Sequence, residues 1–236
     1  MKKNILQLFK SLITSILLCF SNAIGQNCKT DVSVSMAEVK PVLKVALFAA
    51  DAREVGSWGD RVTLSGIGRE NATHAMLEFM QKHADEELVI INVGTVGSPT
   101  FPVGTVLSIS EIISGGAMFL PAPMQLECFD TPATAQLPHA VLYSSDCFVS
   151  PDVYASAYLD SVKLHAQCFD MESSALYSVA KTYNVKYYAF KIVSDNLDVP
   201  FSVWEERVGS LSQTLTAYLS RLFAELGQTY NIVFVR

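Results

Sequence analysis

Three acidic side chains occupy places in the sequence where a sheet would gather polar groups. Glu54 follows the apolar run 43–49, Glu172 opens a stretch with helical periodicity, and Asp195 follows the apolar run 186–193. In open α/β sheets, ligands bind beyond the carboxyl ends of the strands. Each acid alone has an ordinary explanation, as a helix-terminal charge, a turn residue or a solvated group. Together they predict a site for a cation-like species or for sugar hydroxyls.

Two glycine-containing turns, 65–68 and 94–97, lie near these acids in the predicted fold. Glycine lets the backbone approach a ligand closely. Neither turn has the spacing of a dinucleotide-binding motif or a P-loop, so we expect no cofactor. The sequence has no GxSxG motif, and its four histidines have no ligand-like spacing. We therefore expect neither a serine nucleophile of that kind nor a bound metal.

Alternating strand and helix patterns surround the candidate residues. Short apolar runs predict buried strands, and apolar residues with a period of 3.6 predict helices. The expected strands are 43–49, 88–93, 104–109, 140–143 and 186–193, and the expected helices are 70–83, 171–183 and 201–226. This alternation predicts an α/β fold with a parallel or mixed central sheet. Because no repeat or second linker is present, we expect one domain over 41–236.

The composition limits the classes of function. The chain has 236 residues, of which 50% are hydrophobic and 17% are charged, so it is not the sequence of a disordered protein. Its formal net charge is −6, and no cluster of Lys and Arg could follow a phosphate backbone. We therefore expect no nucleic-acid partner.

The N-terminus has the layout of a secretory signal peptide over 1–25. Basic residues precede a short apolar run, 11–20, and small residues stand at Ala23 and Gly25 before Gln26. An amphipathic helix or a disordered leader is the alternative. The polar stretch 26–40 is then a linker. We expect a periplasmic or secreted protein without membrane attachment once the leader is removed, and a cytoplasmic one if it is not cleaved.

Four cysteines remain beyond the leader. An even number in an exported protein permits disulfides, and four cysteines allow three pairings. Each is more often a small buried hydrophobe than a redox centre. They are Cys28, Cys128, Cys147 and Cys168.

Four segments in this order resemble the purine nucleoside phosphorylase/uridine phosphorylase superfamily. Within it, the chain looks most like the methylthioadenosine/S-adenosylhomocysteine nucleosidases. The segments are LSGIGRENA (64–72), INVGTVGS (91–98), FDMESSALYSVA (169–180) and KIVSDN (191–196). The resemblance covers about 43–226. It implies a three-layer α/β sandwich with a mixed central sheet, a homodimer, and cleavage of an N-ribosidic bond through an oxocarbenium-like sugar.

The resemblance also implies roles for the three acids. Asp195 matches the acid that protonates the purine at N7, and Glu172 matches the carboxylate that accepts hydrogen bonds from both ribose hydroxyls. A carboxylate suits that role because it only accepts hydrogen bonds and can accept two. Glu54 matches the glutamate that activates water. The acid and the base must hold opposite protonation states at one pH, which requires different surroundings.

Further positions match residues that contact the nucleoside. Met171 matches a residue packed against the sugar, Phe148 an aromatic ring stacked on the base, and Phe201 an aromatic ring near the 5′ substituent. The backbone of Val149 falls where the edge of the base is recognised. The expected substrate-binding residues are Ser65, Gly94, Phe148, Val149, Met171, Glu172, Ser194 and Phe201.

Several positions depart from the family pattern. Phosphorylases have one arginine near the position of Glu54 and another where this chain has Asn92, and neither is matched here, although Arg53 is only one residue from the expected base. Lys191 replaces the arginine usual in the nucleosidases, and Asp51 stands where an apolar residue normally lines the sugar pocket. The intervals 54–65 and 111–145 look short, since family members usually fit two further strands into the first, so the fold is expected to be shortened.

These observations predict a purine nucleoside N-glycosidase that hydrolyses an adenosine-type nucleoside. The lack of both phosphorylase arginines favours water over phosphate as the nucleophile. A phosphate-dependent nucleoside phosphorylase is one alternative. A non-catalytic nucleoside-binding or storage protein of the same fold is the other, and the shortened segments favour it.

Overall fold

The computed structural model describes residues 40–115 and 122–236, which belong to one compact unit, Lys40–Arg236. The expected signal peptide, 1–25, and all but the last residue of the expected linker, 26–40, lie outside the described residues. In the ranges that the structure describes, no helix combines the length and the hydrophobicity that crossing a bilayer requires.

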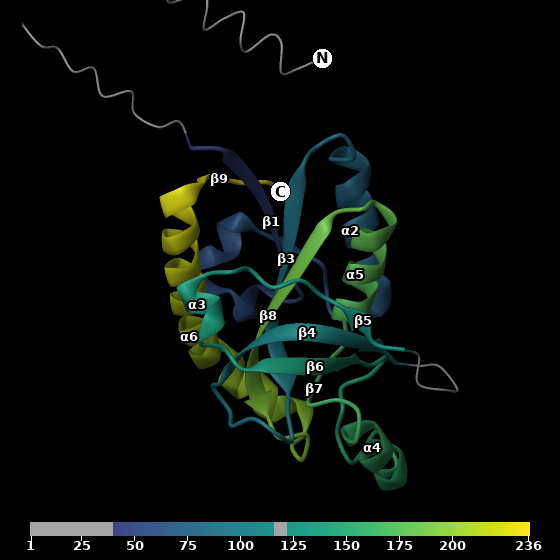
Figure 1. The fold of residues 1–236 in the computed structure, drawn as a ribbon. Coiled ribbons are helices and arrows are strands. Elements are labelled where there is room, and N and C mark those ends of the chain that lie inside the picture. Colours follow the sequence, from purple (N-terminus) through teal and green to yellow (C-terminus); the bar gives the residue numbers. More distant parts are fainter. Residues whose placement is uncertain (1–39, 116–121) are drawn as a thin grey trace, which may run out of the picture. The chain divides into compact units, whose positions relative to one another are not determined.

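A single mixed sheet forms the centre of this unit (Figure 1). Its strands are β1 (Val42–Ala49), β2 (Val62–Leu64), β3 (Leu88–Gly97), β4 (Val106–Ser114), β5 (Met124–Gln125), β6 (His139–Ser144), β7 (Cys168–Asp170), β8 (Lys186–Asp195) and β9 (Asn231–Phe234). β1 is parallel to β3, and β3 is parallel to β8 along almost its whole length. β4 is antiparallel to β8 and parallel to β6, which in turn is parallel to β7.

The pairing closes on itself at the carboxyl end of β3. There Gly97 pairs with Phe169 of β7 in antiparallel fashion, so β3, β8, β4, β6 and β7 form a ring of paired strands. The ladder between β3 and β8 shifts register between Val96 and Gly97. Such an irregularity changes the direction of neighbouring side chains. Here it lies at Gly97, the residue through which β3 pairs with β7.

The outer edge of β1 is shared by two short strands. β9 pairs with the first half of β1 and β2 pairs with the second half, both in parallel. The interval 54–65, which looked short in the sequence, contains the 3₁₀ helix η2 (Gly56–Arg61) and β2.

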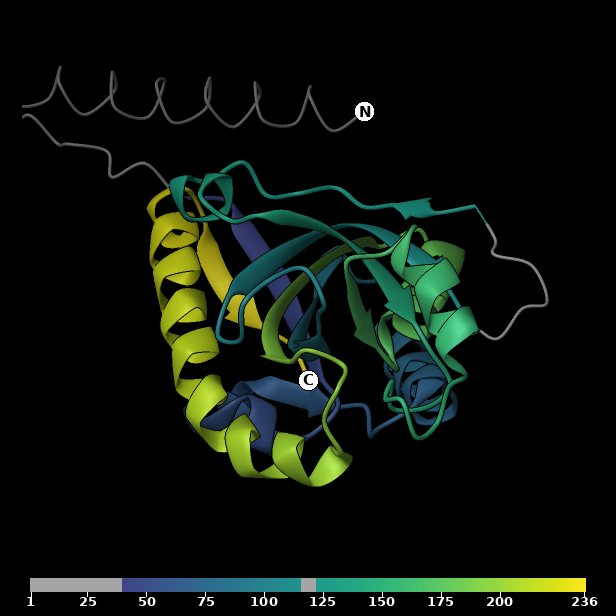
Figure 2. The ribbon, with the colours of Figure 1, turned by 90° about the horizontal axis from the view of Figure 1, so that it is seen from below.

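Helices cover both faces of the sheet, which confirms the predicted three-layer arrangement. α2 (Arg69–Lys82) and α5 (Ser173–Thr182) pack on one face, and α6 (Phe201–Thr229) covers the other together with η2 (Figures 1 and 2). The remaining helices are short: the 3₁₀ helix η1 (Ala52–Glu54), α3 (Pro132–Ala135) and α4 (Ser156–Lys163).

The alternation of side chains along β1 explains how the sheet is held between these layers. Neighbouring residues of a strand point to opposite faces. Phe48 packs edge-to-face on Phe79 of α2, with ring centroids 5.2 Å apart. Leu47 points instead into the core that includes α6, where Trp58 stacks on Phe223 at 5.4 Å. Both faces of the strand are buried, as its continuous apolar run predicts.

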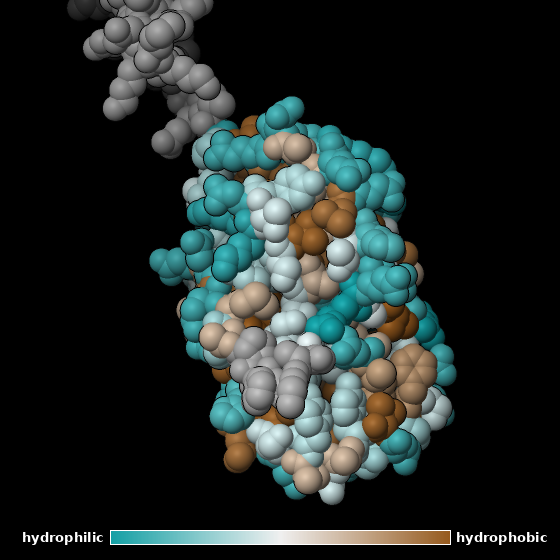
Figure 3. All heavy atoms as spheres, turned by 90° about the vertical axis from the view of Figure 1, so that its right-hand side faces the viewer, coloured by the Kyte–Doolittle hydropathy of each residue, from teal (hydrophilic) through white to brown (hydrophobic). Residues whose placement is uncertain are grey.

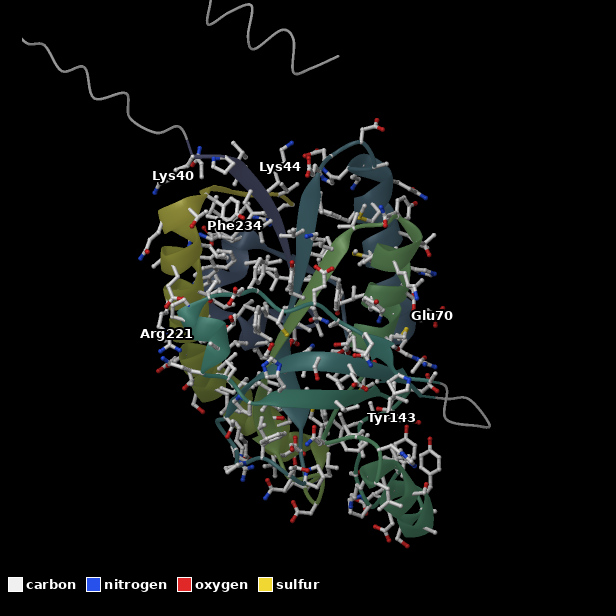
Figure 4. All side chains as sticks on the ribbon, viewed as in Figure 1. Lys40, Lys44, Glu70, Tyr143, Arg221 and Phe234 are labelled. Atoms are coloured by element: carbon white, nitrogen blue, oxygen red, sulfur yellow. The ribbon has the colours of Figure 1, made fainter. Side chains whose placement is uncertain are left out.

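The face of α2 and α5 is mainly hydrophilic, with small separate hydrophobic patches (Figure 3). Charged side chains such as Glu70 on α2 and Arg221 on α6 project from opposite outer sides of the molecule (Figure 4). In the described part of the chain, Cys128, Cys147 and Cys168 are free thiols.

Every strand and helix predicted from the sequence is present, with changed boundaries that matter for the site. β3 continues to Gly97, so the expected turn 94–97 lies within a strand instead of following one. β8 continues to Asp195. The helix expected over 171–183 begins at Ser173, which leaves Glu172 at its N-cap position.

Candidate active site

A cavity opens at the carboxyl ends of β1, β3, β7 and β8, the lower ends of β1, β3 and β8 in Figure 1. The empty space within it, including the open solvent at its mouth, is about 530 Å³. Its wall contains four carboxylates and four aromatic rings. The lining residues are Ala50, Glu54, Ile67, Thr95, Val96, Gly97, Ser145, Phe148, Val149, Phe169, Asp170, Met171, Glu172, Ser194, Asp195, Leu197, Phe201 and Trp204.

Glu54 is held by four hydrogen bonds. Its Oε2 accepts from the backbone N–H groups of Ala50 at 3.1 Å and Asp51 at 3.2 Å. Its Oε1 accepts from both the N–H and the hydroxyl of Thr95, each at 2.7 Å. The side chain is buried, with 4% of the residue exposed. Each oxygen of the carboxylate therefore accepts two hydrogen bonds from described neighbours, while the side chain also borders the cavity.

Arg53 points away from the cavity. Its guanidinium pairs with Asp51 at 2.8 Å and with Glu205 at 3.5 Å, and it lies over the ring of Trp204. The hydrogen bond from Arg53 lowers the pKa of Asp51. Glu54, not Arg53, therefore lines the cavity. Asp51 does not line it, which corrects the expectation that this carboxylate stands in the sugar pocket.

Two of the predicted binding residues lie behind the cavity wall. Gly94 has a positive φ of 152°, and a Cβ there would lie 2.9 Å from Oε1 of Glu54. Glycine is therefore needed to seat the glutamate. Ser65 is buried, and its hydroxyl lies within hydrogen-bond distance of the carbonyls of Ala49 and Gly66. Neither residue is among those that line the cavity, and the contact with a ligand that the sequence predicts for them stays a prediction.

Glu172 lies between the end of β7 and the start of α5. Its Oε1 accepts from the N–H of Gly68 at 2.7 Å, and its Oε2 from the N–H of Met171 at 3.3 Å. Burial, followed by the nearby charge of Asp170, raises the pKa of Glu172 to about 8. Because only two donors contact this carboxylate, it retains acceptor positions that no described residue fills.

Lys191 forms a buried ion pair behind Glu172. Its Nζ lies 3.1 Å from Oδ2 of Asp170 and 3.0 Å from Oδ1 of Asn92, and only 3% of the residue is exposed. Burial alone would lower its pKa, but the charges of Asp170, Glu172 and Glu54 outweigh burial and raise it. The cation is thus committed to Asp170 and does not line the cavity.

Asp195 ends β8 and is 1% exposed. Its Oδ2 accepts from the hydroxyl of Ser194 at 2.8 Å, and its Oδ1 accepts from the N–H of Leu197 at 2.9 Å. Gly97 permits this arrangement, because a Cβ there would lie 2.9 Å from Oδ1 of Asp195.

Aromatic rings from two elements build the side of the cavity near its mouth. Phe148, from the loop after β6, packs edge-to-face on Phe201 at 5.4 Å. Phe201, at the start of α6, stacks on Trp204 at 4.9 Å and is 39% exposed. The indole N–H of Trp204 donates to the hydroxyl of Thr95 at 2.8 Å. These rings offer flat apolar surface for stacking.

The model of the phosphorylase superfamily matches residues 38–224. The chain belongs to the phosphorylase superfamily. No curated protein sequence matches it.

Solved structures of superfamily nucleosidases have the same fold. The 5′-methylthioadenosine/S-adenosylhomocysteine nucleosidase from Helicobacter pylori, with butyl-thio-DADMe-Immucillin-A, matches with a TM-score of 0.65 and 15% identity, over 78% of this chain and 99% of that one. The futalosine hydrolase of Helicobacter pylori gives 0.65 and 16%, over 78% and 98%. The 5′-methylthioadenosine nucleosidase of Arabidopsis thaliana gives 0.66 and 16%, over 78% and 96%. The resemblance stated from the sequence is confirmed for the superfamily and the fold.

Within this superfamily fold, the cavity gathers eight of the ten residues predicted from the sequence. They are Glu54, Phe148, Val149, Met171, Glu172, Ser194, Asp195 and Phe201. Thr95 and Trp204 also line the cavity but were not predicted from the sequence, although Thr95 lies inside the INVGTVGS segment and Trp204 follows Phe201 by one helical turn. The spacing of Phe201 and Trp204 on a predicted helix is the signal that could have found the second ring.

The charges of the cavity wall are of one sign. Among the described residues that line it, none is Lys, Arg or His. Four buried carboxylates share this wall: Glu54, Asp170, Glu172 and Asp195. Such an arrangement can accept hydrogen bonds from hydroxyls, can exchange protons with a ligand, and stabilises positive charge that develops between the carboxylates.

Proposed function

We propose that the chain hydrolyses the N-ribosidic bond of an adenosine-type purine nucleoside. The observation that carries this proposal is that Glu54 and Asp195 line one cavity in which no described lining side chain is cationic. Two carboxylates in different surroundings can serve as base and acid. An incoming phosphate dianion would meet carboxylates and no positive partner there, which favours water as the nucleophile.

Asp195 acts as the general acid in this proposal. A proton delivered to N7 of the purine makes the base a better leaving group as the bond between C1′ and N9 breaks. Phe148 supports this step by offering a face on which the base stacks, and the backbone of Val149 lies beside it for recognition of the base edge. The donor to N7 must be the protonated form of Asp195, and it leaves that form as the base departs.

Glu172 binds the sugar. Its unfilled acceptor positions suit the 2′ and 3′ hydroxyls of ribose, and Met171 beside it provides apolar contact. The negative charge of an ionised Glu172 also favours an oxocarbenium-like sugar over the neutral nucleoside. This is the differential stabilisation that accelerates a reaction.

Glu54 acts as the general base. It takes one proton from a water molecule whose oxygen forms the new bond to C1′, so the products are free base and free ribose. The names of the similar solved structures, nucleosidases and a hydrolase, support the reaction class. Their identity of 15–16% leaves the 5′ substituent to experiment.

The protein's location and assembly are further parts of the proposal. We infer export from the basic and apolar residues of 1–25, and a homodimer from the superfamily resemblance alone. Export would suit the scavenging of external nucleosides. N-terminal sequencing of the protein from its native host is expected to begin at or near Gln26, and an intact Met1 would contradict it.

Product analysis tests the proposed reaction. Purified protein is incubated with a panel of purine nucleosides, with and without phosphate, and base and sugar products are separated by chromatography. Free ribose is expected in both buffers, and Asp195→Asn is expected to lower kcat by about 10²–10⁴-fold with little change in KM. Ribose 1-phosphate formed in phosphate buffer would identify a phosphorylase. Nucleoside binding without any release of base would identify a binding protein.

A further inference from the structure

Two consecutive hydrogen bonds connect α6 to Glu54. The indole N–H of Trp204 donates to Oγ1 of Thr95 at 2.8 Å, and that hydroxyl lies 2.7 Å from Oε1 of Glu54. Trp204 is buried, with 5% exposed. The chain of contacts therefore runs from a helix, through the central strand β3, to the glutamate that follows β1.

Chemistry fixes the direction of both hydrogen bonds. An indole N–H is only a donor, an ionised carboxylate is only an acceptor, and a threonine hydroxyl has a single hydrogen. Because the oxygen of Thr95 accepts from Trp204, its own hydrogen is directed to Glu54. Without the indole, that hydroxyl would be free to rotate toward other acceptors. Hydrogen bonds in such a chain also strengthen one another.

The hydroxyl of Thr95 differs from the other donors to Glu54. Of the four donors that the structure gives this carboxylate, three are backbone N–H groups fixed by the fold. The fourth is the hydroxyl of Thr95, which can rotate about its Cβ–Oγ1 bond. Trp204 thus controls the one adjustable donor of this set.

Trp204 is held in place by Arg53, which precedes Glu54, and by Phe201 of its own helix. Arg53 lies over the Trp204 ring, 4.9 Å from its centroid, and Phe201 stacks on it at the same separation. Arg53 is held in turn by Asp51, at 2.8 Å. The indole is therefore fixed relative to η1 as well as to its own helix.

We propose that Trp204 is a positioning residue for the proposed hydrolysis, which acts through Thr95 to hold the Glu54 carboxylate in a single orientation. The inference rests on the function proposed above. The indole N–H donates to Thr95, so we expect Trp204 to act on the reaction through Thr95 and Glu54. Charged groups near Glu54 include Asp51, the N-cap residue of η1, and Arg53 within η1, and the charges of Glu172 and Lys191 also interact with it.

The test is a pH profile of kcat, which reports groups of the enzyme–substrate complex, for nucleoside hydrolysis by Trp204→Phe, which keeps an aromatic ring and removes the donor. The acid limb is expected to move to higher pH by about half a unit to one unit, because the ionised carboxylate has lost a hydrogen bond. At neutral pH kcat is expected to fall by about 3–10-fold, with KM nearly unchanged. Thr95→Val is expected to shift the limb in the same direction, and Thr95→Ser to restore it.

Trp58→Phe is the matched control. Trp58 is also buried, at 7% exposed, but it stacks on Phe223 away from the cavity. A merely structural loss would lower stability in both variants and leave both acid limbs in place. That result for Trp204→Phe would overturn the proposal while leaving the proposed reaction intact.

The indole N–H resonances give a reading that does not need activity. The chain has two tryptophans, so Trp204→Phe assigns both signals. The Trp204 signal is expected to move on Thr95→Val and on Glu54→Gln, while the Trp58 signal stays in place. If the wild-type protein releases no base, the proposed function fails. The signal shifts still show whether Trp204 is coupled to Glu54 through Thr95. A Trp204 signal unaffected by Glu54→Gln would overturn it.

Discussion

Two buried glutamates line the same cavity in surroundings that differ in kind. Glu54 accepts four hydrogen bonds from its described neighbours, three of them from backbone N–H groups. Glu172 accepts two, both from the backbone, and keeps acceptor positions toward the cavity. A carboxylate that accepts several hydrogen bonds from its own protein is held in one orientation, whereas one with unfilled acceptor positions can bind the hydroxyls of a ligand.

Neighbouring charges also distinguish the two glutamates. Asp170 also lines the cavity and its charge acts on Glu172, and the buried cation Lys191 contacts Asp170 directly. Burial and the charge of Asp170 therefore raise the pKa of Glu172. The difference between the two glutamates therefore depends on how many donors surround each one and on where Lys191, the one buried cation among the described residues, is placed.

The largest effect is expected when Glu54, the glutamate with four donors, is substituted. Glu54→Gln keeps the size of the side chain but cannot take a proton from water, so kcat is expected to fall by about 10²–10⁴-fold with KM little changed. Steady-state kinetics of base release measure this. Glu78→Gln on the surface of α2 is the control and is expected to be neutral. Near-normal turnover by Glu54→Gln would assign the base elsewhere.

The next effect concerns the cation behind Glu172. Lys191→Met leaves Asp170 buried without its partner, and we expect the free energy of unfolding to fall by about 3–5 kcal/mol. Denaturant titration measures it. Lys44→Met removes the exposed pair with Glu86 and is expected to cost less than about 1 kcal/mol. Equal effects of the two substitutions would show that Lys191 does not compensate a buried charge.

A smaller effect is expected from Glu172→Gln. The amide cannot accept two hydrogen bonds from the ribose hydroxyls through charged oxygens, and a hydrogen bond to a charged group contributes about 1.5–3 kcal/mol. We therefore expect kcat/KM to fall by about 10–150-fold, with much of the change in KM. A 2′-deoxynucleoside should lose less from this substitution than the ribonucleoside. Equal losses would separate Glu172 from the sugar.

The smallest effect is a pH dependence of binding. The pKa of Glu172 is raised from its ordinary value of 4.5 to about 8, so at pH 7 the empty site holds its proton. Ribose hydroxyls favour the ionised form, so binding releases the proton and affinity rises as pH increases through 8. Between pH 7 and pH 9 we expect a gain of about tenfold. Equilibrium binding in Glu54→Gln measures it, and adding Glu172→Gln should flatten the curve. Affinity that falls as pH rises would contradict the sign.

The sequence predicted the elements that carry the three acids because their patterns are local. The apolar runs leading to Glu54 and Asp195 and the helical period after Glu172 depend only on neighbouring residues. The short strands β2, β5, β7 and β9 were not predicted. Strands of two to four residues have too little period to be recognised, and they exist because longer strands pair with them.

The contacts that orient the side chains of the site join residues that are far apart in the sequence. Thr95 and Trp204 stand far apart in the chain, and the hydrogen bond between them follows from the packing of α6 against β3. The same applies to Lys191, Asn92 and Asp170, which three different strands bring together. A single sequence shows the residue types but not which of them share a cavity wall. The placement of Gly94 and Ser65 behind that wall is the clearest example.

The pairing of β9 with β1 has a consequence for how the domain is made. β1 is the first described strand to leave the ribosome, yet part of its outer edge is covered only after α6 has been synthesised. Until then this apolar strand presents unpaired backbone groups, which favour association with other chains. Contacts between such distant segments also slow folding. Removal of 231–236 is therefore expected to show first as aggregation during expression, before any change in the reaction at the other end of the strand.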